Sequence, residues 1–316
     1  MKEFLLTLLA FCLVGSIAAQ DEAIFNHYVQ SPIILNPAAV GFDNEYQLQL
    51  SARAAWSGFD DSPKTIAARL NGPVGKSFGI GGTLFSESAA QQNRMKGKLD
   101  VAFRFGFGAK TKKVYDFQMA FGFYTQFERI TVNSGILNNP LVQQGDEVLM
   151  NFIDGENRFD AGIGVYGSYK ENTFGGLTIN NLVSNRLDNI SGESTESNFN
   201  YTFLLGHRFQ VGDEVQITPS VMLRDIQGAP QMFDFNLQAG FLDNKLITGL
   251  SYRNLGSLGL LLGTELDGLH FYYSYDLSFA DFQAYSNGSH ELTVGYRINR
   301  TDLKKRRDNK AKEQNQ

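Results

Sequence analysis

The sequence has one cysteine, few prolines and, beyond its first twenty residues, no long apolar stretch. Because Cys12 lies in the apolar N-terminal stretch, the rest of the chain has neither a disulfide framework nor a thiolate metal site. No later window approaches the roughly eighteen apolar residues of a spanning helix, which excludes a helical membrane protein. A net charge of −5 gives no overall basic character that would indicate nucleic-acid binding. What the chain does have is aromatic residues, at 13%, and 32 glycines.

The N-terminus has the layout of a secretory signal peptide. A basic start is followed by a mostly apolar stretch over 4–14 and then by small residues. We predict a signal peptide over 1–19, with cleavage after Ala19 or, as the alternative, after Ala18. The bulky Phe11 argues against lipidation of Cys12, so we do not expect a lipoprotein. The chain is therefore expected to be exported by the Sec pathway.

From residue 46 onward, apolar and polar residues alternate, which indicates β-strands with one apolar and one polar face. In the first segment Leu48 and Leu50 share one side, and Gln49 lies on the other. No window of comparable length has a helical period, so we expect little helix. The fourteen segments that we predict as strands are 46–56, 64–70, 78–86, 98–107, 115–124, 158–165, 173–180, 199–209, 215–224, 233–241, 245–252, 258–264, 269–276 and 291–298.

Two observations favour a membrane barrel over a soluble two-sheet sandwich, which alternation alone would also fit. The connections alternate between longer and shorter, as the long extracellular loops and short periplasmic turns of outer-membrane barrels do. The apolar faces carry large aromatic side chains, which a barrel turns toward lipid and a sandwich would have to bury. We therefore predict an all-β fold, a closed antiparallel transmembrane β-barrel of about fourteen strands over 46–300, located in the outer membrane.

The polar faces carry charges of both signs, which we expect to line the lumen. These charges could form a selective pore, or they could pair across a narrow lumen and fill it, which the mixed signs favour. The residues that we expect to line the lumen are Arg53, Arg104, Asp116, Arg158, Asp160, Arg224, Asp234 and Asp276.

Residues 20–45 form an N-terminal segment that we place on the periplasmic side, before the first strand. Pro32 and Pro37 exclude a continuous helix there. The segment could cap the periplasmic mouth as a structured turn, or it could act as a plug or as a contact for a periplasmic partner. The candidates for partner binding in this part of the chain are Phe25, Tyr28, Asn36, Pro37 and, after the first strand, Trp56.

The longest connection, 131–157, is unusually apolar for a solvated loop. It could fold inward as a lid, or it could expose a patch that receives a partner protein. Its candidate partner-binding residues are Leu141, Val148, Leu149, Met150 and Phe152.

Catalytic motifs are weak throughout. Residues 75–77 (Gly-Lys-Ser) resemble part of a phosphate-binding loop, but Leu70 stands where the first glycine should be. The four histidines share no metal-ligand spacing. Ser289 and His290 would point to opposite faces of one strand, so they are poorly placed as a catalytic pair. We therefore expect no catalytic residues, no cofactor and no metal site, and an outer-membrane hydrolase stays a third alternative.

Three groups of residues form a pattern typical of one known family. They are Phe25, Tyr28, Pro32, Leu35, Asn36, Pro37, Ala38 and Gly41, then Trp56, Gly58, Phe59 and 62–65, and near the C-terminus 273–276 and 288–292. These residues resemble the PorP/SprF family of Bacteroidetes outer-membrane proteins. The resemblance implies a non-enzymatic component of the type IX secretion system that helps to secrete or anchor a surface protein such as a gliding adhesin.

The partners that the resemblance implies are an exported adhesin or its C-terminal domain and periplasmic components of the secretion system, besides outer-membrane lipid. No nucleic acid is expected. The alternative function is an outer-membrane channel or solute transporter, for which the charged lumen would be suited. The polar, basic tail over 301–316 departs from the typical family ending and could be a solvated tail or a periplasmic docking arm.

Overall fold

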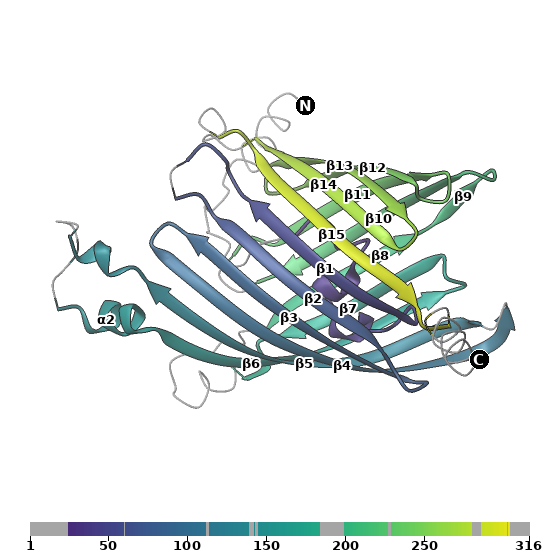
Figure 1. Ribbon diagram of the computed structural model, residues 1–316, viewed down its shortest axis with the longest axis horizontal. Helices are drawn as coiled ribbons and strands as arrows, with labels where there is room; N and C mark the ends of the chain where they lie inside the picture. The colour runs from purple at the N-terminus through teal and green to yellow at the C-terminus, as the bar shows by residue number, and fades with distance from the viewer. Residues whose placement is uncertain are drawn as a thin grey trace, which may run out of the picture.

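A closed barrel of antiparallel strands forms the body of the protein (Figure 1). The computed structural model describes residues 25–59, 61–111, 114–138, 142, 145–183, 199–226, 229–279, 286–301 and 303. Within these ranges, no helix has the length and apolar character needed to cross a membrane. The strands are β1 (Glu45–Ala54), β2 (Lys64–Val74), β3 (Phe78–Ala89), β4 (Gln92–Thr111), β5 (Val114–Val132), β6 (Glu156–Tyr169), β7 (Thr173–Asn180), β8 (Asn200–His207), β9 (Phe209–Val211), β10 (Val215–Asp225), β11 (Met232–Phe241), β12 (Leu246–Arg253), β13 (Ser257–Leu266), β14 (Leu269–Ser278) and β15 (Ser289–Asn299).

Each strand pairs with its neighbours in sequence, and β15 pairs with β1 to close the wall. The closing ladder runs from Glu45 opposite Asn299 to Ala54 opposite His290, so no strand edge is left open there. β8 and β9 both pair with β10 and are separated only at Arg208, so they form one interrupted strand of the wall. The predicted fold class, a closed antiparallel barrel of about fourteen strands, is confirmed.

The side chains sort as a membrane barrel requires, with the apolar face outside. On β1, Leu48 and Leu50 are 52% and 56% exposed, whereas Gln49 and Ser51 are buried in the interior. The exposed apolar side chains on the other strands are likewise large, and most of the buried polar ones line the inside. This inverted arrangement suits a lipid exterior and a polar lumen.

The two ends of the barrel differ in their connections. The end where β1 begins and β15 ends has connections of two to four residues. In outer-membrane barrels, the short turns and both chain termini of the barrel lie on the periplasmic side. We therefore call this end of the barrel the periplasmic end and the opposite one the extracellular end. One predicted extracellular loop, over about 87–97, is wrong. β3 and β4 continue through this segment and are joined by a two-residue turn, with Ala90 at φ +51. The strand alternation also continues here, since Arg94 and Lys96 face inward while Met95 faces outward.

The wall is taller on one side. β4 and β5 have 20 and 19 residues, and their periplasmic ends extend past β3 and β6 at the right of Figure 1. At the left of the figure, the connection between β5 and β6 carries α2 (Glu147–Asp154). Arg129 on β5 ties this helix down by donating from Nη2 to the Asp154 carbonyl at 2.8 Å, and Asp146 accepts from the Leu149 amide at its start. The connection predicted over 131–157 therefore carries the short turn η3 (Ser134–Asn138) and a short helix.

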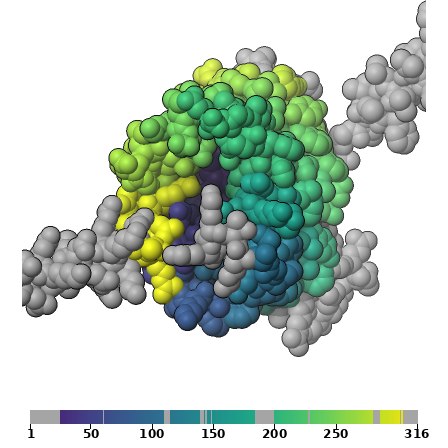
Figure 2. Space-filling model, turned by 90° about the vertical axis from the view of Figure 1, so that its right-hand side faces the viewer, coloured from purple at the N-terminus to yellow at the C-terminus, as the bar shows by residue number. Residues whose placement is uncertain are grey.

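Residues 25–44 lie inside the barrel and form what we call the plug (Figure 1). Two 3₁₀ turns, η1 (Pro32–Ile34) and η2 (Pro37–Ala39), break its path, and each starts with a proline, whose fixed φ suits a first helical position. Viewed from the periplasmic end in Figure 2, purple residues of the plug are visible in the depth of the recess. The sequence left open a turn that caps the periplasmic mouth, a plug, and a contact for a periplasmic partner; residues 25–44 are placed inside the barrel as a plug and not on its periplasmic side.

Candidate functional site

Asn26 fastens the extracellular half of the plug to four residues of the wall. Its backbone amide donates to Glu291 Oε2 at 2.9 Å, and its side-chain nitrogen donates to both carboxylate oxygens of Asp276 at 2.8 Å and to Ser274 Oγ at 3.2 Å. Its side-chain oxygen accepts from Arg253 Nη2 at 3.0 Å. All these partners lie far away in sequence, so only the closed barrel brings them to Asn26.

Opposite charges of the wall pair around this contact. Arg53 donates to Asp276 at 2.8 Å and to Glu291 at 3.1 Å, and Arg253 pairs with Asp234 at 2.8 Å. Asp234, Asp276 and Glu291 are all at most 5% exposed. Because buried carboxylates are stable only when paired and hydrogen-bonded, these pairs hold the lumen closed around the plug at this level.

His27 and Tyr28 follow Asn26 and are fully buried. His27 Nδ1 lies 2.8 Å from Thr293 Oγ1 and 3.0 Å from Glu291 Oε1. Burial lowers the pKa of His27 below its ordinary value, although Glu291 acts in the opposite direction. Burial also raises the pKa of Tyr28, and the nearby Asp234 adds to that. Both side chains are therefore neutral at physiological pH.

The periplasmic half of the plug lies against the backbone of the wall. Asn36 donates from its side chain to the carbonyls of Val165 and Leu177 at 2.9 and 3.3 Å, and its side-chain oxygen accepts from the Ala38 amide at 2.9 Å. A glycine at position 122 permits this close approach, since a Cβ there would overlap the backbone of Ala38. The sequence Asn-Pro-Ala thus fits a groove that the strands leave for it.

The plug leaves the lumen beside Arg104, whose Nη1 donates to the carbonyls of Gly41 and Phe42. The Phe42 ring packs edge-on against Tyr166, with ring centroids 4.8 Å apart. These contacts fix the chain just before it turns into β1.

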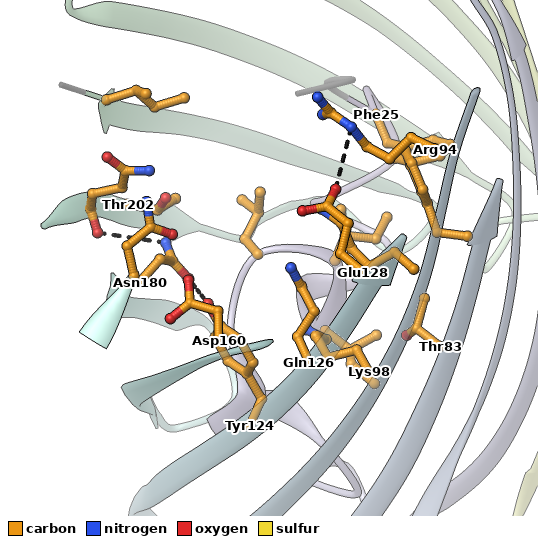
Figure 3. Close-up of a pocket in the computed structure, with 18 of the residues that line it drawn as sticks. Phe25, Thr83, Arg94, Lys98, Tyr124, Gln126, Glu128, Asp160, Asn180 and Thr202 are labelled. Atoms are coloured by element: carbon orange, nitrogen blue, oxygen red, sulfur yellow. Dashed lines mark hydrogen bonds and ion pairs between the residues drawn. The ribbon is translucent and has the colours of Figure 1, made fainter. Parts of the chain in front are cut away.

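Two cavities lie on either side of the plug. The extracellular one, which we call the vestibule, has a volume of about 300 Å³ and a floor formed by Phe25 and the plug residues 33–35. Figure 3 shows its wall, with Arg94 paired to Glu128 at 3.2 Å. The periplasmic cavity has a volume of about 890 Å³ and is lined by residues 29–30 and 42–44 from the other side of the plug. The plug therefore separates the two spaces.

The residues that the sequence predicted to line the lumen take different positions. Arg158, Asp160 and Arg224 line the vestibule, and Arg104 lines the periplasmic cavity. Asp160 is held by the amides of its own neighbour Ala161 and of Val183, at 2.7 and 3.1 Å. Arg53, Asp234 and Asp276 form the pairs around Asn26, as described above, and Asp116 lies at the periplasmic end of β5, opposite the turn after β6.

The predicted partner-binding residues of the N-terminal segment are inside the barrel. Phe25, Tyr28, Asn36 and Pro37 are buried among the strands, so a partner could not contact them while the plug is seated. The prediction took aromatic and Asn-Pro residues before the first strand for surface contacts, whereas the closed wall supplies their partners. Trp56 differs, since it is 44% exposed at the extracellular end and its amide donates to Ser289 Oγ at 3.0 Å.

Around α2, Met150 is exposed and Leu149 and Phe152 are half-buried. Val148 lies in the helix, but its side chain is outside the description, and Leu141 lies outside the described residues.

Sequence reasoning missed Asn26, His27 and Glu291, which are the centre of the plug contact. The signal that existed was the position of Glu291 on the polar face of the last strand, but nothing nearby in sequence indicated its partner. Within the described part of the chain, no group of three His, Cys, Asp or Glu residues is placed to hold a metal ion.

The closed wall, the lipid-suited exterior and the polar lumen define an outer-membrane β-barrel protein, here with its N-terminal segment seated inside. The sequence profile of the type IX secretion system membrane protein PorP/SprF family matches residues 17–296, and the chain therefore belongs to that family. It is an outer-membrane component of the type IX secretion system. No curated protein matches the sequence.

Solved structures with a similar fold are also membrane barrels. The CymD monoaromatic hydrocarbon channel aligns with a TM-score of 0.51 at 10% identity, over 90% of this chain and 94% of that one. The toluene transporter TbuX of Ralstonia pickettii aligns with a TM-score of 0.49 at 10% identity, over 90% and 96%. The KdgM porin aligns with a TM-score of 0.38 at 7% identity, over 80% and 98%. The likeness to CymD supports the barrel fold alone.

Proposed function

We propose that the protein holds an exported surface protein, such as a gliding adhesin, at the outer membrane, and that it does so as a docking barrel rather than as a conduit. Its partners in this role are the exported protein or its C-terminal domain, and periplasmic components of the secretion system. Family membership supports the link to secretion. The observation that carries the choice between docking and transport is the seated plug.

The plug supports docking because its contacts run along the whole lumen. Asn26 binds the paired charges near the extracellular side, Asn36 binds strand carbonyls in the periplasmic half, and Arg104 binds the plug where it leaves the lumen. A polypeptide or solute that crossed the barrel would have to displace all of these. A partner that binds to one end of the barrel would disturb none of them.

The alternative function is a channel or transporter. The two polar cavities favour it, because each opens a part of the lumen to one side of the membrane. For this function the plug would have to move during transport, which gives the two proposals opposite requirements.

Deletion of the gene, followed by measurement of surface-exposed and secreted adhesins, tests the proposal. We expect at least one large surface protein to be lost from the cell surface and restored by the wild-type gene. Unchanged display and unchanged secretion of every adhesin would contradict the proposal.

A further inference from the structure

The vestibule holds a buried cation whose charge is not balanced. Arg69 on β2 lines this cavity and is only 4% exposed. Its guanidinium donates from Nη1 to Ser51 Oγ at 3.1 Å and lies over the Phe25 ring, 4.6 Å from the centroid. Among the described residues it forms no ion pair. A guanidinium has five N–H donors, so most of its donor capacity is unused.

The acidic side chains whose charges act on Arg69, Glu291 and Asp100, are engaged with other cations. Asp100 pairs with Lys98 at 3.0 Å, and Glu291 pairs with Arg53 at 3.1 Å. Burial of a charge without a partner is costly, and a carboxylate that enters the cavity would offset that cost. The position of Arg69 in the wall therefore favours binding of an anionic ligand to its guanidinium.

The rest of the vestibule has the same preference. Six cationic side chains line it against two acidic ones, and one of these two, Asp160, already accepts from backbone amides. Several of the cations have carboxylate partners: Arg94 and Lys96 share Glu128, Lys98 pairs with Asp100, and Arg158 pairs with Glu156. The lining is therefore positive in sum, and Arg69 is the cation among these that an entering carboxylate can pair with without displacing another one. Amide and hydroxyl side chains alternate with the charges, and these can bond to a peptide backbone. The cationic lining residues are Arg69, Arg94, Lys96, Lys98, Arg158 and Arg224, the acidic ones are Glu128 and Asp160, and the neutral polar ones include Gln126, Asn180, Asn200 and Thr202.

The floor of the cavity indicates that the ligand stays where it binds. Phe25 and the plug residues 33–35 close the vestibule toward the periplasm, so an anion drawn into it from outside has no way through while the plug is seated. A volume of about 300 Å³ is at the small end of ligand sites and would hold a few residues of an extended chain.

We infer that the vestibule is a binding site for an acidic peptide segment, and that Arg69 binds a carboxylate of that segment. The inference rests on the proposed function, since it assigns the segment to the exported surface protein that the barrel holds. It gives the docking barrel a specific contact on its extracellular side.

Binding of synthetic peptides to the full chain in lipid nanodiscs, measured by calorimetry, tests the inference. The probes are pentaglutamate, pentaglutamine and the free amino acid glutamate. We expect pentaglutamate alone to bind measurably at low salt, and binding to weaken as salt screens the charges. Binding of pentaglutamine equal to that of pentaglutamate would overturn the acidic preference, and equal binding of free glutamate would indicate a solute site instead.

Substitution then assigns the contact to Arg69. We expect Arg69→Gln to weaken pentaglutamate binding roughly 10- to 100-fold, since it removes a charge-assisted hydrogen bond, and Arg69→Lys to retain part of the affinity. The matched control is Arg208→Gln, which removes an arginine that lies over Phe174 and lines the periplasmic cavity. Heat-modifiable migration of each variant verifies the folded barrel. Equal affinity of Arg69→Gln and the wild type would overturn the assignment.

Display in cells separates this inference from the proposed function. If gene deletion removes a surface protein and Arg69→Gln displays it normally, the vestibule inference fails and the docking function stands. If deletion changes no display but pentaglutamate binds through Arg69, the docking function fails and the vestibule site stands. Loss of display in Arg69→Gln with retention in Arg208→Gln would support both.

Discussion

The contact of Asn26 with the wall allows a quantitative prediction of how firmly the plug is held. Asn26→Asp keeps the shape of the side chain but replaces its donor nitrogen with a second carboxylate oxygen. That oxygen would lie where Nδ2 now donates to both oxygens of Asp276 at 2.8 Å. The new charge would also join Asp276 and Glu291, which are already buried, while the contact with Arg253 would be retained.

Two terms set the magnitude of the effect. Loss of a hydrogen bond to a charged group costs about 1.5–3 kcal/mol. Repulsion between carboxylates about 3 Å apart is on the order of 5 kcal/mol at an effective dielectric constant near 20, and attraction to Arg253 at 3.0 Å offsets most of it. The free energy that holds the plug should therefore fall by about 2–3 kcal/mol, which corresponds to roughly 30- to 150-fold more frequent release.

Release can be measured as the rate at which a thiol in the plug becomes accessible. Val29→Cys places the reporter at a buried position of similar volume, in a protein from which Cys12 has been replaced by serine. A maleimide that carries a polymer too bulky for the cavity reacts only after the plug leaves, so its rate follows the opening equilibrium. We expect Asn26→Asp to raise the rate by the stated factor.

The matched control is Asn44→Asp, which makes the same change at a half-buried position at the periplasmic end, with φ +60. It should leave the rate within about twofold of the parent, since the Asn44 side chain forms no hydrogen bond or ion pair with the described residues that the change would break. Equal labelling of the Asn26→Asp variant and its parent would refute the claim that Asn26 fastens the plug.

Two further predictions concern the same labelling assay. Gly122→Ala should speed labelling by several-fold to about 100-fold, because its Cβ would overlap the backbone of Ala38 at an overpacking cost of about 1–3 kcal/mol. The control is Gly82→Ala, whose Cβ would meet nothing closer than 3.8 Å and which should therefore leave the labelling rate unchanged. If both glycine variants labelled alike, close packing at Gly122 would not matter for seating. The second prediction concerns the labelling rate divided by that of an exposed cysteine at the same pH, which removes the slower reaction of the thiol itself at low pH. This relative rate should rise as the pH falls below about 6.5, because burial lowers the pKa of His27 and the released plug binds the proton first. The seated plug is thus fully stabilised above that pH and loses stability below it. His27→Gln should flatten this profile, and an unchanged profile in that variant would assign the pH dependence to another group.

The strands could be predicted because a barrel wall repeats one local rule. Alternation of apolar and polar residues places each side chain toward lipid or lumen, so segments such as 115–124 and 269–276 are evident without any tertiary information. The rule fails over 87–97. Arg94 and Lys96 there are spaced as strand residues, but Gly97 interrupts the apolar side of the pattern, so the pattern predicts a loop although the segment continues β3 and β4.

The plug could not be derived in the same way, because its stability comes from residues remote in sequence. Asn26 and Glu291 are 265 positions apart, and only closure of β15 on β1 brings them together. Nor could the difference between a paired and an unpaired lumen charge be read from the pattern. Arg53 and Arg69 both lie on polar faces, yet Arg53 has two carboxylate partners and Arg69 forms no ion pair among the described residues.

The most direct test of a docking barrel is to lock the plug in place and measure surface display. The side chains of Gln30 in the plug and Gln238 on β11 are hydrogen-bonded to each other, so cysteines at both positions can be joined by a short reducible thiol cross-linker. With the plug locked, we predict normal display of the surface protein and no ion conduction in planar bilayers. Loss of display on cross-linking, with recovery after reduction, would show that the plug must move and would contradict the account.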